Sequence, residues 1–462
     1  MNKNRANGAT ESILPMGGTA EKKAGKIGTI DSTSYETALL PNGVRAAVAE
    51  MPYMESVSIG IWSGVGSRHE SDELSGIAHF AEHMVFKGTQ RWSSRELTAE
   101  VEAVGGDIDA YTMADQTCYY IKGPAESLPK FLDVLADLYL RPLFPAEEVN
   151  REREVIREEI VSYREQPNQH VEGLLGFAAW PNSPVGRLVT GTSESIANIT
   201  RESLLEFTSE HYRGSKTVAA VAGRIDSAET LERLGKVLGK VPSGASASGS
   251  PGSPGGPDSD LHAASGLRLL FDKRDTDQVQ IGIGFLCSGR HDEQQEALRA
   301  LNVLLGGSMS SRLWQTLRED RGLCYEVQTE LQTLDDGGLF QLYAGVDADN
   351  VHETLKVALA EIRDLAENGP TEEELRGAID YANGTQRVAL EDTASQMLWA
   401  GESLLHFQRV IEPRTARESL ETVTADDVRR VAAKIFAPAN LAGAFVGPQE
   451  ETAELRTILE SW

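Results

Sequence analysis

The sequence has no long uninterrupted run of apolar residues, and this absence bears on membrane insertion. A helix that spans a bilayer needs about 20 consecutive, mostly apolar residues, and no stretch of the 462 residues provides them. The N-terminal residues also lack the apolar core of a secretory signal, and Glu11 and Glu21 do not fit the acid-poor composition of an organelle transit peptide. We therefore expect a protein without a membrane span or an export signal.

Cysteine and positive charge are both scarce. The three cysteines, Cys118, Cys287 and Cys324, are odd in number and widely spaced, which favours a reducing compartment over a disulfide framework. Lysine and arginine number 44 against 70 aspartates and glutamates, so the formal net charge is −26. A surface of that sign repels phosphate backbones and anionic lipids. We expect a cytoplasmic protein with neither a nucleic-acid partner nor a membrane partner.

One segment is too poor in large apolar residues to bury anything. Residues 243–260 contain Gly, Ser or Pro at fourteen of 18 positions, a composition typical of a coil linker with a span of roughly 25 Å. Residues 1–35 show no periodicity and are expected to form a flexible lead-in. These boundaries predict an N-terminal half at 36–242 and a C-terminal half at 261–462.

The two predicted halves contain an internal repeat. Residues 57–70 align without gaps on residues 279–292, at a constant offset of 222, and both copies share an Ile-Gly-Ile strand and end in Arg-His followed by an acidic residue. The chain length alone would suggest about three domains. The repeat replaces that number with two homologous halves.

Hydrophobic periodicity predicts a mixed α+β fold. Alternating apolar residues predict strands at 57–62, 109–120, 267–272, 279–286 and 338–345. Helical spacing predicts helices at 76–87, 94–104, 128–139, 146–165, 293–306, 310–319 and 349–367. This order favours two sandwich-type halves, each a sheet with helices on one face, joined by the linker into a hinged clamshell.

Two histidines one helical turn apart form the sharpest local signal. His79 and His83 occur in the sequence His-Phe-Ala-Glu-His, so both imidazoles project from one face of a helix and can bind one metal ion. Glu82 lies on the same side, close enough to activate a metal-bound water. The alternative is a pair of histidines hydrogen-bonded within the core.

A catalytic zinc site usually has three protein ligands, so a third must come from elsewhere. The predicted helix after Pro145 offers Glu152 and Glu159, which are seven residues apart and share a face. The alternative is that both are solvated members of a charged helix, paired with its arginines. Spacing leaves other glutamates of this helix equally available: Glu147, Glu148, Glu154, Glu158 and Glu165.

The motif and its surroundings resemble a known peptidase family. His-x-x-Glu-His inverts the commoner metalloprotease order, and HFAEHMVFKGT at residues 79–89 resembles the pitrilysin and insulinase family of zinc peptidases. The likeness is nearest to the mitochondrial processing peptidase β subunit and its bacterial relatives. It covers nearly the whole chain after residue 35, because LPNGVRAAVAE, GGDIDAYTMADQTCYY and SSRLWQTLREDRGLCYEV follow in the family's order.

The resemblance implies a zinc endopeptidase that binds one zinc ion per chain. A glutamate about 76 residues after the second histidine is the family's third ligand, which selects Glu159 beside His79 and His83. Glu82 would be the general base that takes a proton from the zinc-bound water and passes it to the leaving amine. Glu152 matches an acidic residue that supports the site.

The resemblance also implies a substrate site. The family carries an arginine and a tyrosine seven residues apart, a spacing kept here by Arg318 and Tyr325; Tyr325 would donate to the oxyanion and Arg318 would hold substrate carbonyls. An extended peptide would add a strand to a sheet edge at Ala110, Tyr111 and Thr112. Asp109 stands where the family often has asparagine, and its carboxylate leads to the hypothesis that basic peptides are favoured.

The second half is expected to lack a metal site. The repeat offset carries His79, Glu82 and His83 onto three leucines, at 301, 304 and 305. Some members of the resembled family are non-catalytic structural or substrate-recognition subunits, which is the alternative function, and a metal-storage protein is a third. Because this chain keeps both the zinc motif and the Arg318–Tyr325 pair, we expect an active peptidase that forms a homodimer, with a heterodimer as the alternative.

Overall fold

The computed structural model describes residues 33–244, 261 and 266–462. The predicted lead-in at 1–35 and linker at 243–260 lie almost entirely outside these residues. Within the described ranges, none of the helices combines the length and the apolar character needed to cross a bilayer.

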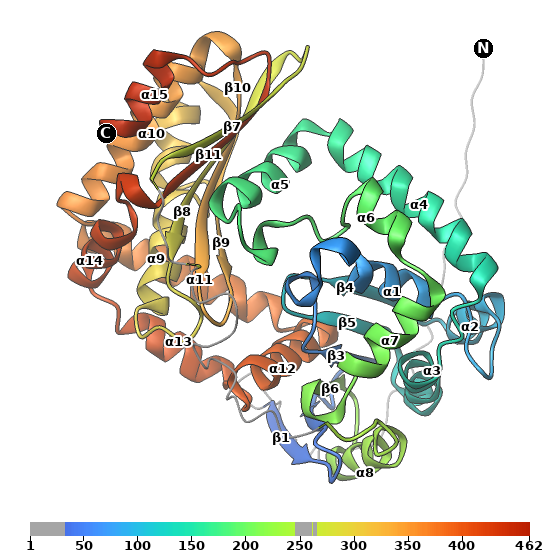
Figure 1. Cartoon of the computed structure of the whole chain (residues 1–462). Helices are drawn as coiled ribbons and strands as arrows, with labels where there is room; N and C mark the ends of the chain where they lie inside the picture. The colour runs from blue at the N-terminus through green and yellow to red at the C-terminus, as the bar shows by residue number, and fades with distance from the viewer. Residues whose placement is uncertain (1–32, 245–260, 262–265) are drawn as a thin grey trace, which may run out of the picture.

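The N-terminal half is built on a six-stranded sheet (Figure 1). Its strands lie in the order β1 (Ser34–Leu39), β2 (Arg45–Glu50), β6 (Thr217–Gly223), β3 (Ser56–Ser63), β5 (Thr117–Pro124) and β4 (Asp107–Thr112). Strands β2 and β6 are parallel and the other neighbours are antiparallel. Strand β4 is therefore an edge strand, bonded to a neighbour on one side only.

Helices of the same half cover one face of this sheet. They are α1 (Ile77–Val85), α2 (Ser94–Glu102), α3 (Leu128–Leu140), α4 (Ala146–Glu165), α6 (Ser193–Asn198), α7 (Arg201–His211) and α8 (Ser227–Leu238). Their apolar residues form one buried cluster with alternate residues of the strands, for example Phe80, Phe131 and Ile59. Burial of these side chains at about 1.5–3 kcal/mol each fixes the sheet against α1, the helix that carries the two histidines.

The C-terminal half repeats this plan. Its sheet has the order β7 (Arg268–Lys273), β11 (Leu441–Gly447), β8 (Gln278–Cys287), β10 (Gly338–Asp347) and β9 (Cys324–Thr333), with β7 and β11 parallel and the rest antiparallel. The helices on its own face are α9 (Gln295–Leu305), α10 (Val351–Glu367), α11 (Glu372–Ala389), α13 (Pro413–Glu421), α14 (Ala425–Ile435) and α15 (Ala453–Glu460). The α+β fold with two homologous halves is thus confirmed.

Two predicted elements differ in detail from the structure. The predicted strand at 109–120 is a hairpin of β4 and β5, because Met113 N–H donates to Gln116 O at 2.8 Å and closes a turn that contains neither glycine nor proline. The predicted helix at 310–319 is present, but its residues from Trp314 on belong to a π-helix, Trp314–Asp320, a type that apolar spacing over so short a segment does not distinguish from an α-helix.

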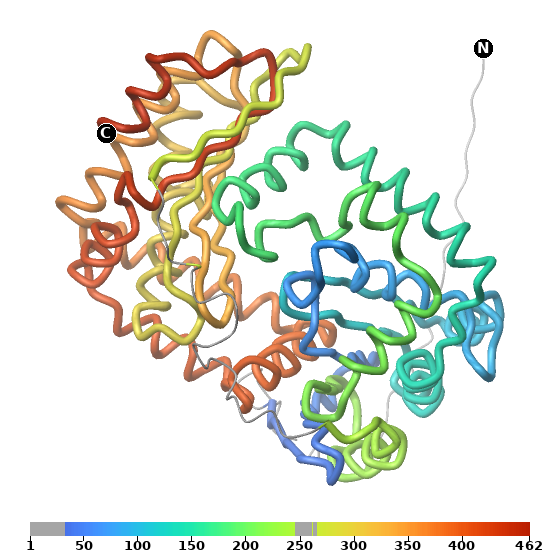
Figure 2. Tube along the Cα trace, in the orientation of Figure 1, coloured from blue at the N-terminus to red at the C-terminus, as the bar shows by residue number. Residues whose placement is uncertain are grey.

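The second face of each sheet is covered by a helix from the other half. Helix α5 (Pro167–Ala179) of the N-terminal half lies on β11, β8 and β7, and helix α12 (Thr393–Phe407) of the C-terminal half lies on β6, β3 and β2. The exchange is visible in Figure 1, and the trace in Figure 2 follows the green segment of α5 to the yellow and red strands. The two halves are therefore interlocked.

Small residues allow these helices to approach the sheets closely. On β6, Val218, Ala220 and Ala222 face α12, and on β11, Ala442 and Ala444 face α5. Strands buried on both faces become continuous apolar runs, such as TVAAVAG in β6. Because such short runs show no alternation, the periodicity of the sequence did not predict β6 and β11.

Two reciprocal ion pairs also join the halves. Arg68 donates to Asp336 in the β9–β10 turn at 2.9 and 2.7 Å. Arg290, its equivalent in the repeat, donates to Asp115 in the β4–β5 turn at 2.6 Å and lies 3.2 Å from Asp335. These two aspartates, Asp115 and Asp335, form a further group of potential metal ligands with His406, and Arg290 is paired with both carboxylates.

Two glycine substitutions, one on α12 and one on α11, should have opposite effects on the stability of the fold. A Cβ at Gly401 of α12 would lie 2.3 Å from a ring carbon of the fully buried Trp62, whereas a Cβ at Gly384 of α11 would meet nothing within 4 Å. We expect Gly401→Ala to destabilise the fold by about 1–3 kcal/mol through overpacking. Gly384→Ala should stabilise it by up to about 1 kcal/mol through helix propensity. Thermal unfolding measures both, and midpoint shifts of the same sign would contradict this account.

Candidate active site

Helix α1 is anchored at its N-terminus by a buried carboxylate. Glu70 accepts hydrogen bonds from Gly76 N–H at 2.7 Å and from Ala78 N–H at 2.8 Å, two of the donors that a helix start leaves unpaired. Gly76 has a φ of 94°, and a Cβ there would lie 2.6 Å from Thr190 O, so glycine is required. Burial raises the pKa of Glu70 to about 7 despite these bonds. The anchor fixes the direction in which the histidines project.

The two histidines of α1 converge on one glutamate of α4. Glu159 Oε2 lies 3.7 Å from His79 Nε2 and 3.7 Å from His83 Nε2, and the three ligand atoms lie within 4.8 Å of one another. Ligand atoms held about 2.1 Å from a tetrahedral zinc ion lie about 3.4 Å apart. The structure therefore brings these three residues together, at a separation that fits one metal ion.

The surroundings of His79 favour the neutral form of its imidazole. Its ring is buried and its Nδ1 atom has no hydrogen-bond partner. Burial, reinforced by the nearby His83, lowers the pKa of His79 to about 3. Its imidazole is therefore neutral at physiological pH, the form that binds metals.

Glu152 fixes the orientation of His83. Its Oε1 lies 2.9 Å from His83 Nδ1, and its Oε2 lies 2.6 Å from Lys87 Nζ. Burial opposes ionisation of Glu152, but the bonds from His83 and Lys87 outweigh it and lower the pKa of the carboxyl. An ionised Glu152 holds a proton on His83 Nδ1, which leaves Nε2 free to face Glu159. Glu158, the neighbour of Glu159, is exposed and belongs to no group of potential ligands among the described residues.

Glu82 lies beside the three potential ligands in a shared cavity. The cavity has a volume of about 570 Å³ and is lined by all four side chains and by Ala110, Tyr111 and Thr112 of the β4 edge. Glu82 accepts a hydrogen bond from Thr112 Oγ1. Burial raises the pKa of Glu82 despite this bond, and a more basic carboxylate is better suited to take up a proton.

Asp109 is exposed at the same strand edge. Its carboxylate accepts hydrogen bonds from Ala110 N–H at 2.8 Å and from the Tyr120 hydroxyl at 3.1 Å. These local partners hold the carboxylate at the edge of β4, one residue before Ala110, which lines the cavity that contains Glu82.

Arg318 and Tyr325 lie together but away from this cavity. The Arg318 guanidinium lies 5.0 Å from the Tyr325 ring centroid and 4.1 Å from that of Trp314. Tyr325 is 76% exposed, and neither residue is among those that line the cavity of the three potential ligands. The pair is available at the surface of the C-terminal half.

Sequence reasoning missed several residues of the site. The glutamate that anchors α1, Glu70, occurs in a segment read only as a repeat. The bond between Thr112 and Glu82 and the contact of Tyr111 with Glu402 had no local signal, because each joins segments that are distant in sequence.

Two protein-family models match successive parts of the chain, and the boundary between them lies within the N-terminal half. Residues 45–193 match the model of the insulinase family, peptidase family M16, and residues 198–381 match the model of the M16 inactive domain. An uncharacterized zinc protease of Streptomyces coelicolor is 34% identical over 89% of this chain and 88% of its own. The chain belongs to peptidase family M16. The predicted resemblance to the insulinase family is confirmed.

Other M16 relatives agree. An uncharacterized zinc protease of Bacillus subtilis is 33% identical over 84% of this chain and 92% of its own. A solved protease structure from Helicobacter pylori has a TM-score of 0.82 at 23% identity, covering 90% of this chain and all of that one, and so shares the fold. The relatives named zinc proteases support a peptidase role for this M16 chain.

Proposed function

We propose that this M16 protein is a zinc-dependent endopeptidase that hydrolyses peptide bonds in unstructured peptides. The observation that carries the proposal is the convergence of His79, His83 and Glu159 beside the buried carboxylate of Glu82. The relatives named zinc proteases make zinc the expected metal. We expect one ion per chain, held by these three ligands. A non-catalytic subunit would have no need of Glu82 at this position.

His79, His83 and Glu159 would hold the metal, and Glu152 would keep His83 in the required tautomer. When bound, zinc supplies a Lewis acid that polarises a carbonyl and lowers the pKa of a water molecule. Glu82 would accept the proton of the attacking water and deliver it to the leaving amine. Its raised pKa, caused by burial, suits both transfers.

The substrate would bind in extended form along β4. An edge strand has free main-chain donors and acceptors, which pair with any unfolded peptide and make few demands on its sequence. The cavity at Glu82 adjoins a second one of about 1070 Å³, with which it shares Thr112, Glu172 and Leu188, so a chain can extend beyond the site of cleavage. The acidic lining and Asp109 favour basic peptides.

Cleavage products test this function. Zinc-loaded protein should cut an unstructured peptide at internal bonds, at least about tenfold faster than the same sequence within a folded protein, because a folded chain offers no free strand edge. Mass spectrometry identifies the products, and a basic and an acidic peptide of equal length test charge preference. Removal of single terminal residues only would contradict the endopeptidase assignment.

We further propose that Arg318 and Tyr325 act on the site of a second copy in a homodimer. Tyr325 is exposed and Arg318 is partly exposed, both lie away from the cavity of their own chain, and the exchanged helices interlock the two halves of one chain. Tyr325 of one copy would then donate to the oxyanion formed at the other copy's site.

Mixing two inactive variants tests this arrangement. Glu82→Gln and Tyr325→Phe should each be nearly inactive, but a mixture that re-forms dimers should recover about a quarter of wild-type activity, since random pairing unites an intact Glu82 with an intact Tyr325 at one site in four. A mixture that remains as inactive as its components would show that Tyr325 does not act across a dimer.

A further inference from the structure

Strand β4 is held between two helices that come from different halves of the chain. Side chains alternate between the two faces of a strand. Ala110 packs into the apolar cluster that contains residues of α1. Tyr111 packs against the cluster that contains Trp62 of β3 and Met397 of α12. The two faces of β4 therefore pack against clusters that contain different helices. One is α1, the helix that carries His79 and His83, and the other is α12 of the C-terminal half.

On the first face, β4 contacts the proposed general base. Thr112 Oγ1 donates a hydrogen bond to Glu82 Oε2 and lies 3.5 Å from Thr117 Oγ1 of β5. A displacement of β4 would therefore displace the group that orients the Glu82 carboxylate.

On the second face, β4 is bonded to α12. The Tyr111 hydroxyl donates to Glu402 Oε1 at 3.0 Å and accepts from Trp62 Nε1 at 3.1 Å. Burial, followed by the proximity of Cys118 and Glu402, raises the pKa of Tyr111, so its hydroxyl keeps the proton that it donates. This bond crosses from the N-terminal half to the C-terminal half.

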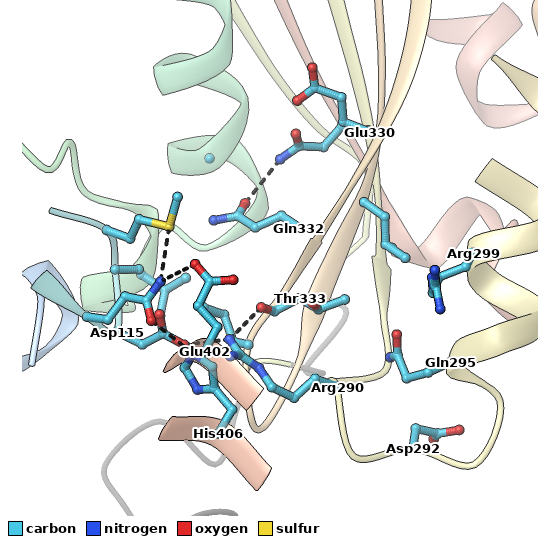
Figure 3. Close-up of a pocket in the computed structure, with 18 of the residues that line it drawn as sticks. Asp115, Arg290, Asp292, Gln295, Arg299, Glu330, Gln332, Thr333, Glu402 and His406 are labelled. Atoms are coloured by element: carbon cyan, nitrogen blue, oxygen red, sulfur yellow. Dashed lines mark hydrogen bonds and ion pairs between the residues drawn. The ribbon is translucent and has the colours of Figure 1, made fainter. Parts of the chain in front are cut away.

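Helix α12 also holds the turn that follows β4. Gln116 Nε2 donates to Glu402 Oε1 at 3.3 Å, and Gln116 Oε1 lies 3.0 Å from His406 Nε2, one turn further along α12. Gln116 is 3% exposed. Figure 3 shows Glu402 and His406 projecting toward the turn of Asp115. One oxygen of Glu402 thus accepts hydrogen bonds from the strand and from its turn. We call the four residues linked by these bonds the β4 bridge: Tyr111, Gln116, Glu402 and His406.

We propose that Glu402 is a positioning residue for the peptidase site: through Tyr111 and Gln116 it fixes the edge strand that pairs with substrate and carries Thr112. The inference rests on the proposed function. An edge strand is bonded along one side only, so its position depends on its side-chain contacts. Misplacement of a positioned group by about 1 Å can cost about 100-fold in rate.

The bridge gives the C-terminal half a part in the reaction through Glu402, which is not one of the three potential ligands His79, His83 and Glu159. Glu402 lines the cavity of about 1070 Å³. Its hydrogen bonds go to Tyr111 and Gln116, neither of which is one of the three potential ligands. Its effect is therefore separable from zinc binding.

Three variants test the proposal. Glu402→Ala removes the acceptor, Glu402→Gln keeps an acceptor oxygen, and Glu418→Ala on α13 removes an equal charge from an exposed pair with Arg414. We expect Glu402→Ala to lower kcat/KM about tenfold and to raise hydrogen exchange of the β4 amides at residues 107–112 about tenfold. Glu402→Gln should stay within about twofold of wild type in both, and Glu418→Ala should change neither. Zinc content and the melting temperature should hold in all three.

Additional readouts separate this inference from the proposed function. In a Glu82→Gln background, which keeps the peptide uncut, Glu402→Ala should weaken binding of a fluorescent unstructured peptide about tenfold. If wild type hydrolyses no peptide, the proposed function fails, while peptide affinity and exchange at residues 107–112 still decide the bridge. Unchanged exchange, raised exchange with unchanged kcat/KM, or equal losses in the alanine and glutamine variants would each overturn the proposal. So would a loss of kcat/KM accompanied by loss of zinc.

Discussion

Replacing Glu82 by glutamine should abolish peptide hydrolysis while leaving zinc in place. The Glu82 carboxylate lies in the same cavity as the three potential ligands, His79, His83 and Glu159, but its proposed role is proton transfer and not metal binding. Glutamine has nearly the same shape and can still accept the bond from Thr112, but it cannot take up a proton. General acid–base catalysis contributes typically about 10²–10⁴-fold. We expect kcat to fall by at least about 100-fold.

The measurement combines turnover of an unstructured peptide with zinc analysis of the same preparation. Glu154→Gln on α4 is the control, because Glu154 is an exposed carboxylate paired with Arg157, and it should behave as wild type. If Glu82→Gln retained full turnover, Glu82 would not be the base and the proposed mechanism would fail. If it lost zinc, its role would be structural.

Replacing Glu159 by glutamine should remove zinc and activity together. An amide oxygen is a neutral and weaker ligand than a carboxylate, and even residues that only support a metal ligand cost about 10–100-fold in affinity when changed. We therefore expect zinc affinity to fall by more than about 100-fold, as measured by competition with a chromogenic chelator. Turnover should fall in proportion to the zinc lost.

Glu158→Gln is the matched control for this variant. It makes the same chemical change one residue earlier on α4, at an exposed side chain outside the group of potential ligands. Wild-type affinity in Glu158→Gln beside a loss in Glu159→Gln would support the geometry of the site. The reverse result would show that the helix carries its third ligand in a different register.

Much of the metal site could be predicted because its information is local. A histidine pair one turn apart needs only a helix to become a two-ligand face, and α1 provides it. The choice among the glutamates of α4 could not be made from local spacing, because several glutamates of this helix were equally available as the third ligand. The resemblance selected Glu159, and the structure places its carboxylate 3.7 Å from both histidine Nε2 atoms. The closer likeness to processing peptidases stays a prediction.

The rest of the site depends on contacts that no local pattern encodes. Glu402 lies on a helix of the opposite half and reaches Tyr111 only because α12 crosses to the N-terminal sheet. The strands that receive this helix are short apolar runs rich in alanine, without the alternation that marks a strand with one buried face. Periodicity therefore predicted some of the helices on one face of each sheet, such as α1 and α9, but neither of the exchanged helices on the other face.

The exchange of α5 and α12 has a consequence for how this protein can be divided. A half produced alone would expose an apolar sheet face and retain an unpaired helix of the matching shape. Two such fragments satisfy each other by exchanging helices, as in a domain-swapped dimer. The full chain is then the covalent form of that dimer, the arrangement expected when the gene of a swapped dimer duplicates and fuses. Neither half should fold as an independent unit, and the pair should unfold in one cooperative step.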